Sequence, residues 1–195
     1  MSAFEYAAIF IGIVVGLALQ NTLSSIHKLV EAGSRVRWHW MAPVAAFGAI
    51  VLTLGNFWFW WLARDLPSSV SHSFLMFLAS AMALSLLFLA CAATLPDEVP
   101  GEGLDLKDYY FDNRHRMWGY SAAYYFVSLC IWTAVVVQRG YQSPTLHTDL
   151  IFVAANAAAV AMSVTLIVVR NWWLHAIWLV GGLLFLLLLY GPMPV

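Results

Sequence analysis

The fold of this chain is indicated most clearly by one apolar stretch, LIFVAANAAAVAMSVTLIVVRNWWLHAIWLVGGLLFLLLL, which covers residues 150–189. Arg170 is the only Asp, Glu, Lys or Arg within it. Crossing the roughly 30 Å of hydrocarbon in a bilayer takes about 20 mostly apolar residues in a helix. The stretch contains two such runs, 150–169 and 172–189, joined by Arg170 and Asn171. Because the connection is so short, we expect a tight antiparallel pair of membrane-spanning helices.

Four more runs of the same kind precede this stretch. They cover residues 3–23, 41–62, 74–95 and 117–137. Of the 195 residues, 63% are hydrophobic and only 10% are charged, more apolar surface than a water-soluble fold of this size could bury. We therefore predict an all-α, polytopic transmembrane bundle of about six spans that forms a single domain over residues 1–195.

The orientation follows from the basic residues in the connections. Arg64 and Arg139 lie on one predicted side of the membrane. The other side carries seven basic residues: Lys28, Arg35, Arg37, Lys107, Arg114, Arg116 and Arg170. Basic residues are enriched on the cytoplasmic side of membrane proteins. If the chain belongs to a bacterial inner membrane, we expect both of its termini in the periplasm. The scattered bases and the net charge of -1 give no sign of a nucleic-acid partner.

Three predicted cytoplasmic turns resemble one another. They read RVRWHW at 35–40, RHRMW at 114–118 and RNWWLH at 170–175, and each opens the second span of a pair. One interpretation is three helical hairpins in series, since internal repeats are common in transport folds. The other is that cytoplasmic ends favour Arg and membrane interfaces favour Trp. On either interpretation these turns are candidates for lipid-headgroup or partner contacts, through Arg35, Arg37, Trp38, Arg114, Arg116, Trp118, Arg170 and Trp172.

The one long connection, residues 96–116, holds six of the ten acidic residues. Its acids do not follow the spacing of a calcium-binding loop. From Asp105 onward, apolar and aromatic residues recur at three- and four-residue spacing, with Asp105 placed as a helix N-cap. We predict a short amphipathic helix on the cytoplasmic surface, with Tyr109 and Tyr110 toward the membrane or a partner and the acids toward water.

Polar residues within the spans are few. Asn56 and Asn156 should face the bundle interior, because an amide in hydrocarbon needs hydrogen-bond partners, and Gln20 and Asn21 are further candidates near the cytoplasmic end of the first span. They could line a path for a neutral solute or only fix the packing of helices. No span has a central charged residue, which argues against an ion-coupled transporter or pump.

Small and aromatic residues suggest how the helices pack. Gly12 and Gly16 in the first span, and the alanines between Ala154 and Ala161 in the fifth, would allow close approach of backbones. We expect both helices to be central in the bundle. The aromatic cluster at 57–61 is typical of a belt at the membrane interface, and contact with a partner or pigment is the less favoured alternative.

Histidine and cysteine raise the question of a metal or haem. Four of the six histidines, His27, His39, His115 and His175, map to the predicted cytoplasmic ends of spans. A membrane haem needs two imidazoles facing each other inside the bundle. We therefore expect interfacial hydrogen bonding by these histidines, and no cofactor or metal. The two cysteines lie in apolar runs and are expected to pack as small hydrophobes.

Several short motifs give the chain a family likeness. These are Phe4-Glu5 before a glycine-containing first span, Leu95-Pro96-Asp97, and a loop motif with Asp105-Leu106, Tyr109-Tyr110-Phe111 and Asn113-Arg114. With them the chain resembles a widespread set of bacterial six-helix membrane proteins of unknown function. The resemblance implies the six-span topology and a bacterial source, and it transfers no functional residue.

Three functions are compatible with these features. The first, which we favour, is a non-enzymatic accessory or assembly subunit of a larger membrane complex, in contact with the lipid bilayer and with other subunits or further copies of itself. The second is a channel or carrier for a small neutral or polar solute. The third is an interfacial enzyme acting on lipid or quinone, for which His115, Asp108 and Arg114 would supply the acid–base group.

Overall fold

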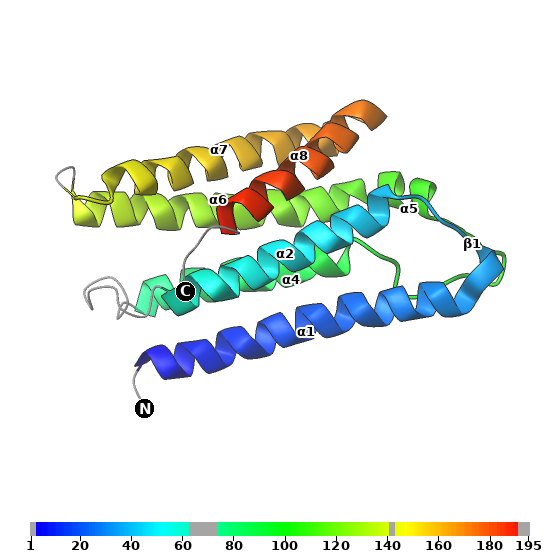
Figure 1. The fold of residues 1–195 in the computed structure, drawn as a ribbon, viewed down its shortest axis with the longest axis horizontal. Helices are drawn as coiled ribbons and strands as arrows, with labels where there is room; N and C mark the ends of the chain where they lie inside the picture. Colours follow the sequence, from blue (N-terminus) through cyan, green and yellow to red (C-terminus); the bar gives the residue numbers. More distant parts are fainter. Residues whose placement is uncertain (1–2, 63–73, 141–142, 191–195) are drawn as a thin grey trace.

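The computed structural model describes residues 3–62, 74–140 and 143–190 and shows an all-α helical bundle (Figure 1). Six long helices form it: α1 (Ala3–Ala32), α2 (Met41–Leu62), α4 (Phe74–Ala92), α6 (Arg114–Arg139), α7 (Leu146–Val168) and α8 (Trp172–Tyr190). The short elements are η1 (Gly33–Arg35), β1 (Val36–Arg37), β2 (Leu104–Asp105) and α5 (Leu106–Asp112). The predicted fold class is confirmed. The predicted aromatic belt at 57–61 lies partly outside the described side chains.

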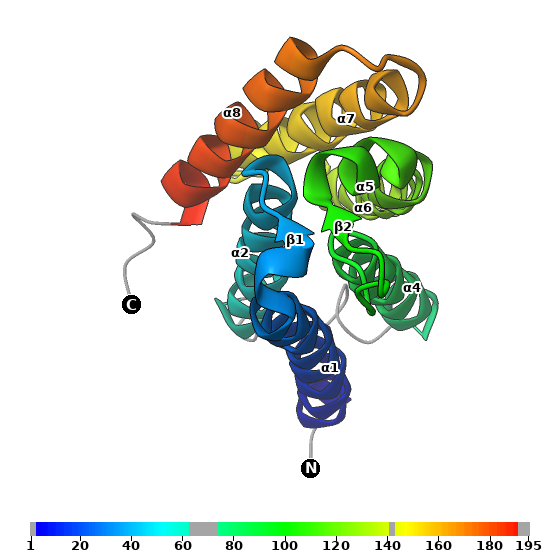
Figure 2. The same ribbon diagram turned by 90° about the vertical axis from the view of Figure 1, so that its right-hand side faces the viewer.

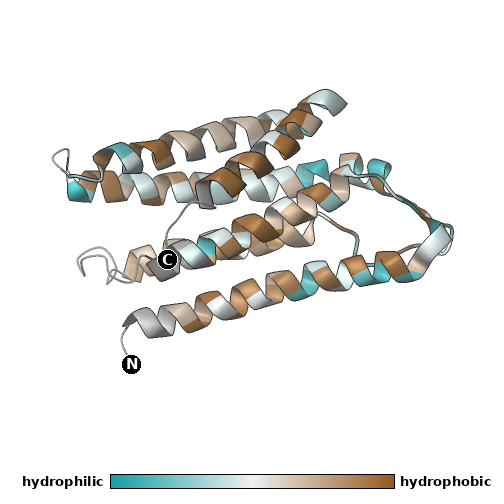
Figure 3. Cartoon of the chain, in the orientation of Figure 1, coloured by the Kyte–Doolittle hydropathy of each residue, from teal (hydrophilic) through white to brown (hydrophobic). Residues whose placement is uncertain are grey.

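The outer surface of the bundle is apolar. Large side chains such as Phe74 and Val168 are 73% and 75% exposed, and hydrophobic residues run along the helices between more polar ends (Figure 3). Soluble proteins rarely expose contiguous apolar surface on this scale, whereas lipid would cover it. By length and composition α1, α2, α4, α6 and α7 can each cross a membrane. The protein is therefore membrane-embedded, and a sixth crossing by the shorter α8 stays a prediction.

The helices alternate in direction. In Figure 1, α1, α4 and α7 run toward the right-hand end, and α2, α6 and α8 start there and run back. The short elements η1, β1, β2 and α5 lie at the same end, which Figure 2 views directly. We call this the basic end and define it by residues 25–40, 93–118 and 166–175, which include the seven basic residues noted above.

The last two helices do not form the predicted tight pair. Helix α8 turns back after α7, but it packs mainly along α2 and shares few contacts with α7 (Figure 2). A short connection dictates the reversal of direction and leaves the crossing angle free. The buried Leu179 of α8 joins the core cluster around Met41 of α2, so α8 follows the apolar surface available on α2. The third hairpin of the predicted series is thus splayed.

Helix α1 is longer and more peripheral than expected. It continues past the predicted end at residue 23 to Ala32, which at 1.5 Å per residue makes it about 45 Å long. Its C-terminal turns lie against the long connection, where Lys28 Nζ donates to the carbonyl oxygen of Asp97 at 2.8 Å. It packs on α4 and α2 only along one side, so the prediction of a central position was wrong.

Gly12 and Gly16 of α1 and the outward-facing alanines of α7 are not used for packing within the described chain, whereas Ala159 is buried where α7 packs closely along α6. A Cβ built on Gly12 or Gly16 would meet no atom within 4 Å. On α7, Ala154, Ala158 and Ala161 are exposed. The expected close approach of backbones therefore does not occur between these faces and the rest of the bundle.

One close approach does require glycine. Strands β1 and β2 pair in parallel, with Val36 opposite Leu104. Gly103, just before β2, has a φ of 100°, and a Cβ there would lie 2.9 Å from the carbonyl oxygen of Arg35. Both the backbone conformation and the missing side chain are needed to hold the long connection against the turn after α1.

We expect Gly103→Ala to destabilise the protein by about 1–3 kcal/mol, because the new methyl group collides with backbone and the φ is unfavourable for alanine. The measurement is the midpoint of unfolding in lipid or mild detergent, with tryptophan fluorescence as the readout. Gly101→Ala is the control, since a Cβ at Gly101 meets open space. Equal stability of the two variants would contradict this account of the turn.

Candidate functional site at the basic end

The three similar turns of the sequence converge at the basic end. The ring of Trp40, from the first turn, lies edge-on to that of Trp172 in the third, with centroids 6.1 Å apart. Trp118, from the second turn, lies 6.2 Å from His175 of the third. Helices α2, α6 and α8 therefore begin around one shared cluster of aromatic side chains.

His175 is at the centre of this cluster and is fully buried. Its Nε2 lies 2.9 Å from the carbonyl oxygen of Val169, and its Nδ1 lies 3.0 Å from the Tyr110 hydroxyl. A carbonyl oxygen can only accept a hydrogen bond, so Nε2 carries the proton in the neutral ring. Nδ1 then accepts from the Tyr110 hydroxyl, and the imidazole links α5 to the connection between α7 and α8.

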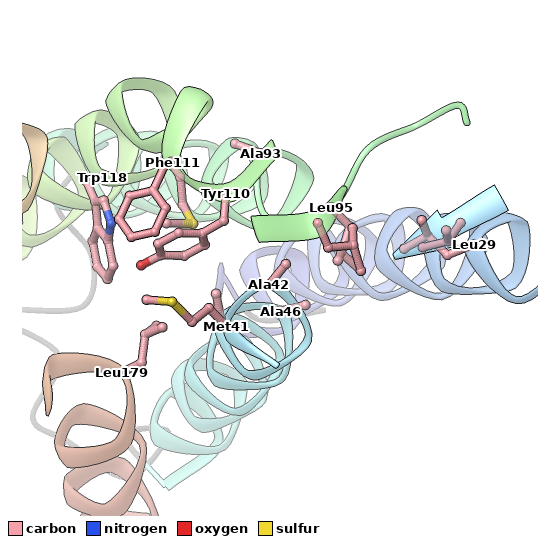
Figure 4. Close-up of a cluster of buried hydrophobic side chains, with 14 of the residues drawn as sticks. Leu29, Met41, Ala42, Ala46, Ala93, Leu95, Tyr110, Phe111, Trp118 and Leu179 are labelled. Carbon is pink, nitrogen blue, oxygen red and sulfur yellow. The ribbon is translucent and has the colours of Figure 1, made fainter. Parts of the chain in front are cut away.

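Aromatic rings enclose this hydrogen-bonded pair. Tyr110, Phe111 and Trp118 gather above Met41 and Leu179 in Figure 4, and all five side chains belong to one buried cluster. Burial raises the pKa of the Tyr110 hydroxyl well above its usual value, an effect that the nearby Trp118 indole partly offsets. The indole nitrogen nevertheless makes no hydrogen bond of normal geometry to any described residue. The hydroxyl stays protonated and can serve as the donor to His175.

Arg114 connects two further elements at the same place. This half-buried side chain donates from Nη1 to the carbonyl oxygen of Phe111 at 2.7 Å and from Nε to that of Ile167 at 3.3 Å. Carbonyls at the C-terminal ends of helices lack partners within the helix, and a cation there is favourable. Arg114 thus holds the ends of α5 and α7 together.

Helix α5 begins where the sequence predicts. Asp105 Oδ1 accepts from the backbone nitrogens of Lys107 at 2.8 Å and Asp108 at 3.4 Å. These bonds, with Arg37 at 3.3 Å, hold the pKa of the Asp105 carboxyl below its usual value. The N-cap and the short amphipathic helix are confirmed. Its apolar face, however, meets the end of the bundle.

The junction of α5 and α6 is fixed to the end of α4. Asn113 Nδ2 donates to the carbonyl oxygen of Ala93 and to the Tyr109 hydroxyl. Burial, followed by the charge of Asp97, raises the pKa of Tyr109 to about 12. Tyr109 is thereby held as a neutral, half-buried side chain at the edge of the bundle.

The structure divides the residues predicted to contact headgroups or a partner. Tyr110 and Trp118 are buried in the core, so for them the prediction was wrong. The guanidinium of Arg114 donates its hydrogen bonds to backbone carbonyl oxygens within the bundle. The side chains of Tyr109 and Trp172 are half-buried, and those that remain exposed are Arg35, Arg37, Trp38, Arg116 and Arg170. Hydropathy alone could not tell a face that meets the bundle from one that meets lipid.

The intramembrane asparagines are not brought together. Asn56 of α2 donates from Nδ2 to the carbonyl oxygen of Leu52 at 2.9 Å and to the Tyr124 hydroxyl of α6 at 2.7 Å. Asn156 donates to the carbonyl oxygen of Phe152 in its own helix, α7. These bonds occupy the amide donors in local packing.

The two amide residues of α1 behave differently from each other. Gln20 is exposed on the outside of the bundle, so it takes no part in packing or in a polar path within the described chain. The side-chain nitrogen of Asn21 is buried and has no hydrogen-bond partner among the described residues. Hydropathy indicated that α1 spans the membrane but not which side of it packs.

The residues considered for acid–base chemistry or metal binding do not assemble. His115 and Asp108 are both exposed, and no hydrogen bond joins them in the part of the chain that the structure describes. Within that part, no group of three His, Cys, Asp or Glu side chains could hold a metal ion. His27 lies 4.0 Å from Glu31 on the surface of α1, so of the four histidines considered His175 is the one enclosed by the core.

A buried ion pair at the opposite end was not predicted. Arg139 Nη1 lies 3.0 Å from both carboxylate oxygens of Asp149, which also accepts from Thr145 Oγ1 at 3.0 Å. The side chain of Asp149 is 4% exposed and that of Arg139 is 20% exposed. Asp149 directly precedes the apolar run that begins at residue 150, so hydropathy places it in the connection between two spans. The sequence does carry a signal for this ion pair, because a base, Arg139, and an acid, Asp149, flank a short polar turn.

Comparisons with protein-family models, with curated proteins and with solved structures found no match for this chain. The resemblance to six-helix bacterial membrane proteins therefore stays a prediction, and the function has to be argued from the geometry.

Proposed function

We propose that the protein is a non-enzymatic subunit that helps to assemble a larger complex in the bacterial inner membrane. The observation that carries this proposal is the pair of small-residue faces left open on α1 and α7. Small residues at a lipid-facing helix surface favour close packing against another helix. Gly16 on one side of the bundle, and Ala158 on the other, are available for such contacts.

The polar groups inside the bundle make hydrogen bonds that favour a role in helix packing over a role in solute transport. Asn56 bonds to Tyr124, and Asn156 bonds within its own helix. A similar pair joins Thr53 of α2 to Cys91 of α4, at 3.4 Å. Asn56 and Thr53 thus link α2 to its neighbours, and Asn156 is satisfied locally, so we favour a structural role over a path for a solute.

The helices are held together tightly at the basic end, as a role in assembly requires. The Tyr110–His175 pair and Arg114 bind α5, α6, α7 and α8 to one another. Arg35, Arg37 and Trp38 remain exposed beside this cluster. We propose that they face the cytoplasm, where they contact lipid headgroups or another subunit.

Blocking the open face of α7 tests this function. We expect Ala158→Phe to leave the isolated protein folded, because Ala158 is exposed, and to reduce the fraction of protein found in a large complex in native membranes by about tenfold, because the ring prevents close helix packing. The measurement is native gel electrophoresis after mild extraction. Met82→Phe on α4, also an exposed position, is the matched control.

Loss of the complex in Ala158→Phe alone would support the proposal. Migration of the native protein as a single chain, with neither variant changing its mobility, would overturn it. Equal loss in both variants would show that bulk on any lipid-facing helix is disruptive, and it would count against α7 as an assembly surface.

A further inference from the structure

Gln20 projects from the outer face of α1 with no part of the described chain covering it. The residue is exposed and makes no hydrogen bond with any described residue. Its neighbours on this surface, Ile13 and Leu17, are 58% and 49% exposed, as expected for side chains in contact with lipid. A polar amide thus stands on an otherwise apolar surface.

Along the bundle, Gln20 lies at the level of the apolar part of α4, although its side chain is on the opposite side of α1. The ring of Phe10 lies 5.8 Å from that of Phe77, and Ser25 Oγ lies 3.5 Å from a carboxylate oxygen of Asp97. Gln20 is five residues before Ser25, about 7.5 Å along the helix at 1.5 Å per residue. It therefore lies short of the level at which α1 meets its first charged neighbour. An amide in hydrocarbon without a hydrogen-bond partner is costly.

Two glycines lead up to this amide along α1. Gly12 and Gly16 precede Gln20 at intervals of four residues, so the three positions lie along one side of the helix. A Cβ on either glycine would meet open space. We call this surface the α1 outer face and define it by Ile9, Gly12, Ile13, Gly16, Leu17 and Gln20. It points away from the α1 residues buried against the bundle, which include Ile11, Val15 and Ala18.

The partner that this face fits best is a second copy of the same chain. Copies in one membrane are inserted in the same orientation, so two α1 helices meet in parallel and can be related by a two-fold axis. Such an axis places glycine against glycine and Gln20 against Gln20. An amide carries both donors and an acceptor, so two identical amides satisfy each other. Any other partner would need to supply its own polar group at that depth.

We propose that two copies of this protein dimerise through their α1 outer faces, with the backbones in contact at Gly12 and Gly16 and the Gln20 amides hydrogen-bonded to each other. The inference rests on the proposed function and names the first partner in the assembly. Gly-x-x-x-Gly faces with flanking aliphatic side chains allow such close contact between helices, and an interhelical amide bond adds to it.

The test uses the full chain purified and reconstituted alone into lipid vesicles. Molecules that each carry one fluorophore are counted by single-molecule photobleaching over a range of protein-to-lipid ratios. We expect dimers, whose dissociation constant rises about tenfold in Gln20→Leu, because the amide bonds are lost. In Gly16→Leu the dimer should disappear, because the side chain separates the backbones.

Gly181→Leu on α8 is the matched control. Gly181 is also exposed, with open space at its Cβ, and this variant should dimerise like the native chain. Native protein that is monomeric at every protein-to-lipid ratio would overturn the inference. So would a Gln20→Leu variant as tightly associated as the native protein, or equal losses in Gly16→Leu and Gly181→Leu.

These outcomes are separable from the proposed function. A chain that is single in vesicles but enters a large complex in native membranes would refute the α1 dimer and leave the subunit role standing. A dimer in vesicles that remains only a dimer in native membranes would support the inference and refute the role in a larger complex.

Discussion

The Asp149→Ala variant is expected to lose about 3 kcal/mol of folding free energy. Breaking a buried ion pair from one side leaves an uncompensated charge, which costs roughly 3–5 kcal/mol. We place the loss at the low end because the side chain of Arg139 keeps 20% of its surface exposed and can turn toward water. Asp149 also accepts from Thr145, so the α6–α7 turn loses a second bond. The measurement is reversible unfolding in mixed micelles.

A double variant separates the charge effect from the loss of packing. Arg139→Met with Asp149→Leu removes both charges and fills the space with apolar atoms, and similar replacements of buried pairs are often neutral. We expect it to be more stable than Asp149→Ala alone. If Asp149→Ala unfolds at the native midpoint, the ion pair contributes nothing and this account of the turn fails.

The second large effect is expected at the basic end, where Tyr110→Ala should cost about 3–5 kcal/mol. Deleting a buried aromatic ring leaves a cavity, and Nδ1 of His175 loses its hydrogen-bond donor. Because Tyr110 joins α5 to α8, we expect α5 to detach before the transmembrane helices separate. Hydrogen exchange at residues 106–112, together with the unfolding midpoint, measures this.

Tyr110→Phe is the graded control for that prediction. It keeps the ring and removes only the hydroxyl, so the expected cost is about 1–3 kcal/mol, that of leaving a buried acceptor unpaired. Lys107→Ala, an exposed change on the same helix, should leave exchange in α5 almost unchanged. Exchange in Tyr110→Ala no faster than in Lys107→Ala would contradict the role of the Tyr110–His175 pair.

The transmembrane helices could be predicted from sequence because lipid leaves the backbone few alternatives. Each apolar run has to satisfy its own hydrogen bonds, and a helix is the simplest way to do so. The N-cap at Asp105 was also predictable, since its partners are only two and three residues away. Features that depend on neighbours close in sequence were therefore the ones identified.

What could not be predicted depends on contacts distant in sequence. Tyr109 and Tyr110 are adjacent, yet only Tyr110 is fully buried, because the Asn113 bond to Ala93 and the pairing of β1 with β2 set how α5 is placed. The direction of α8 depends on α2, more than a hundred residues earlier. The exposure of Gln20 likewise depends on which side of α1 packs against α4. Hydropathy carries none of this information.

The central claim is that this chain acts as part of an assembly, and the mass of the particle it forms in its own membrane tests that most directly. Native membranes would be solubilised without detergent into polymer-bounded discs, and the particles weighed by native mass spectrometry. We predict particles that contain two copies of the 21.7 kDa chain together with at least one other subunit. Discs that hold a single 21.7 kDa chain and no other protein would contradict the account.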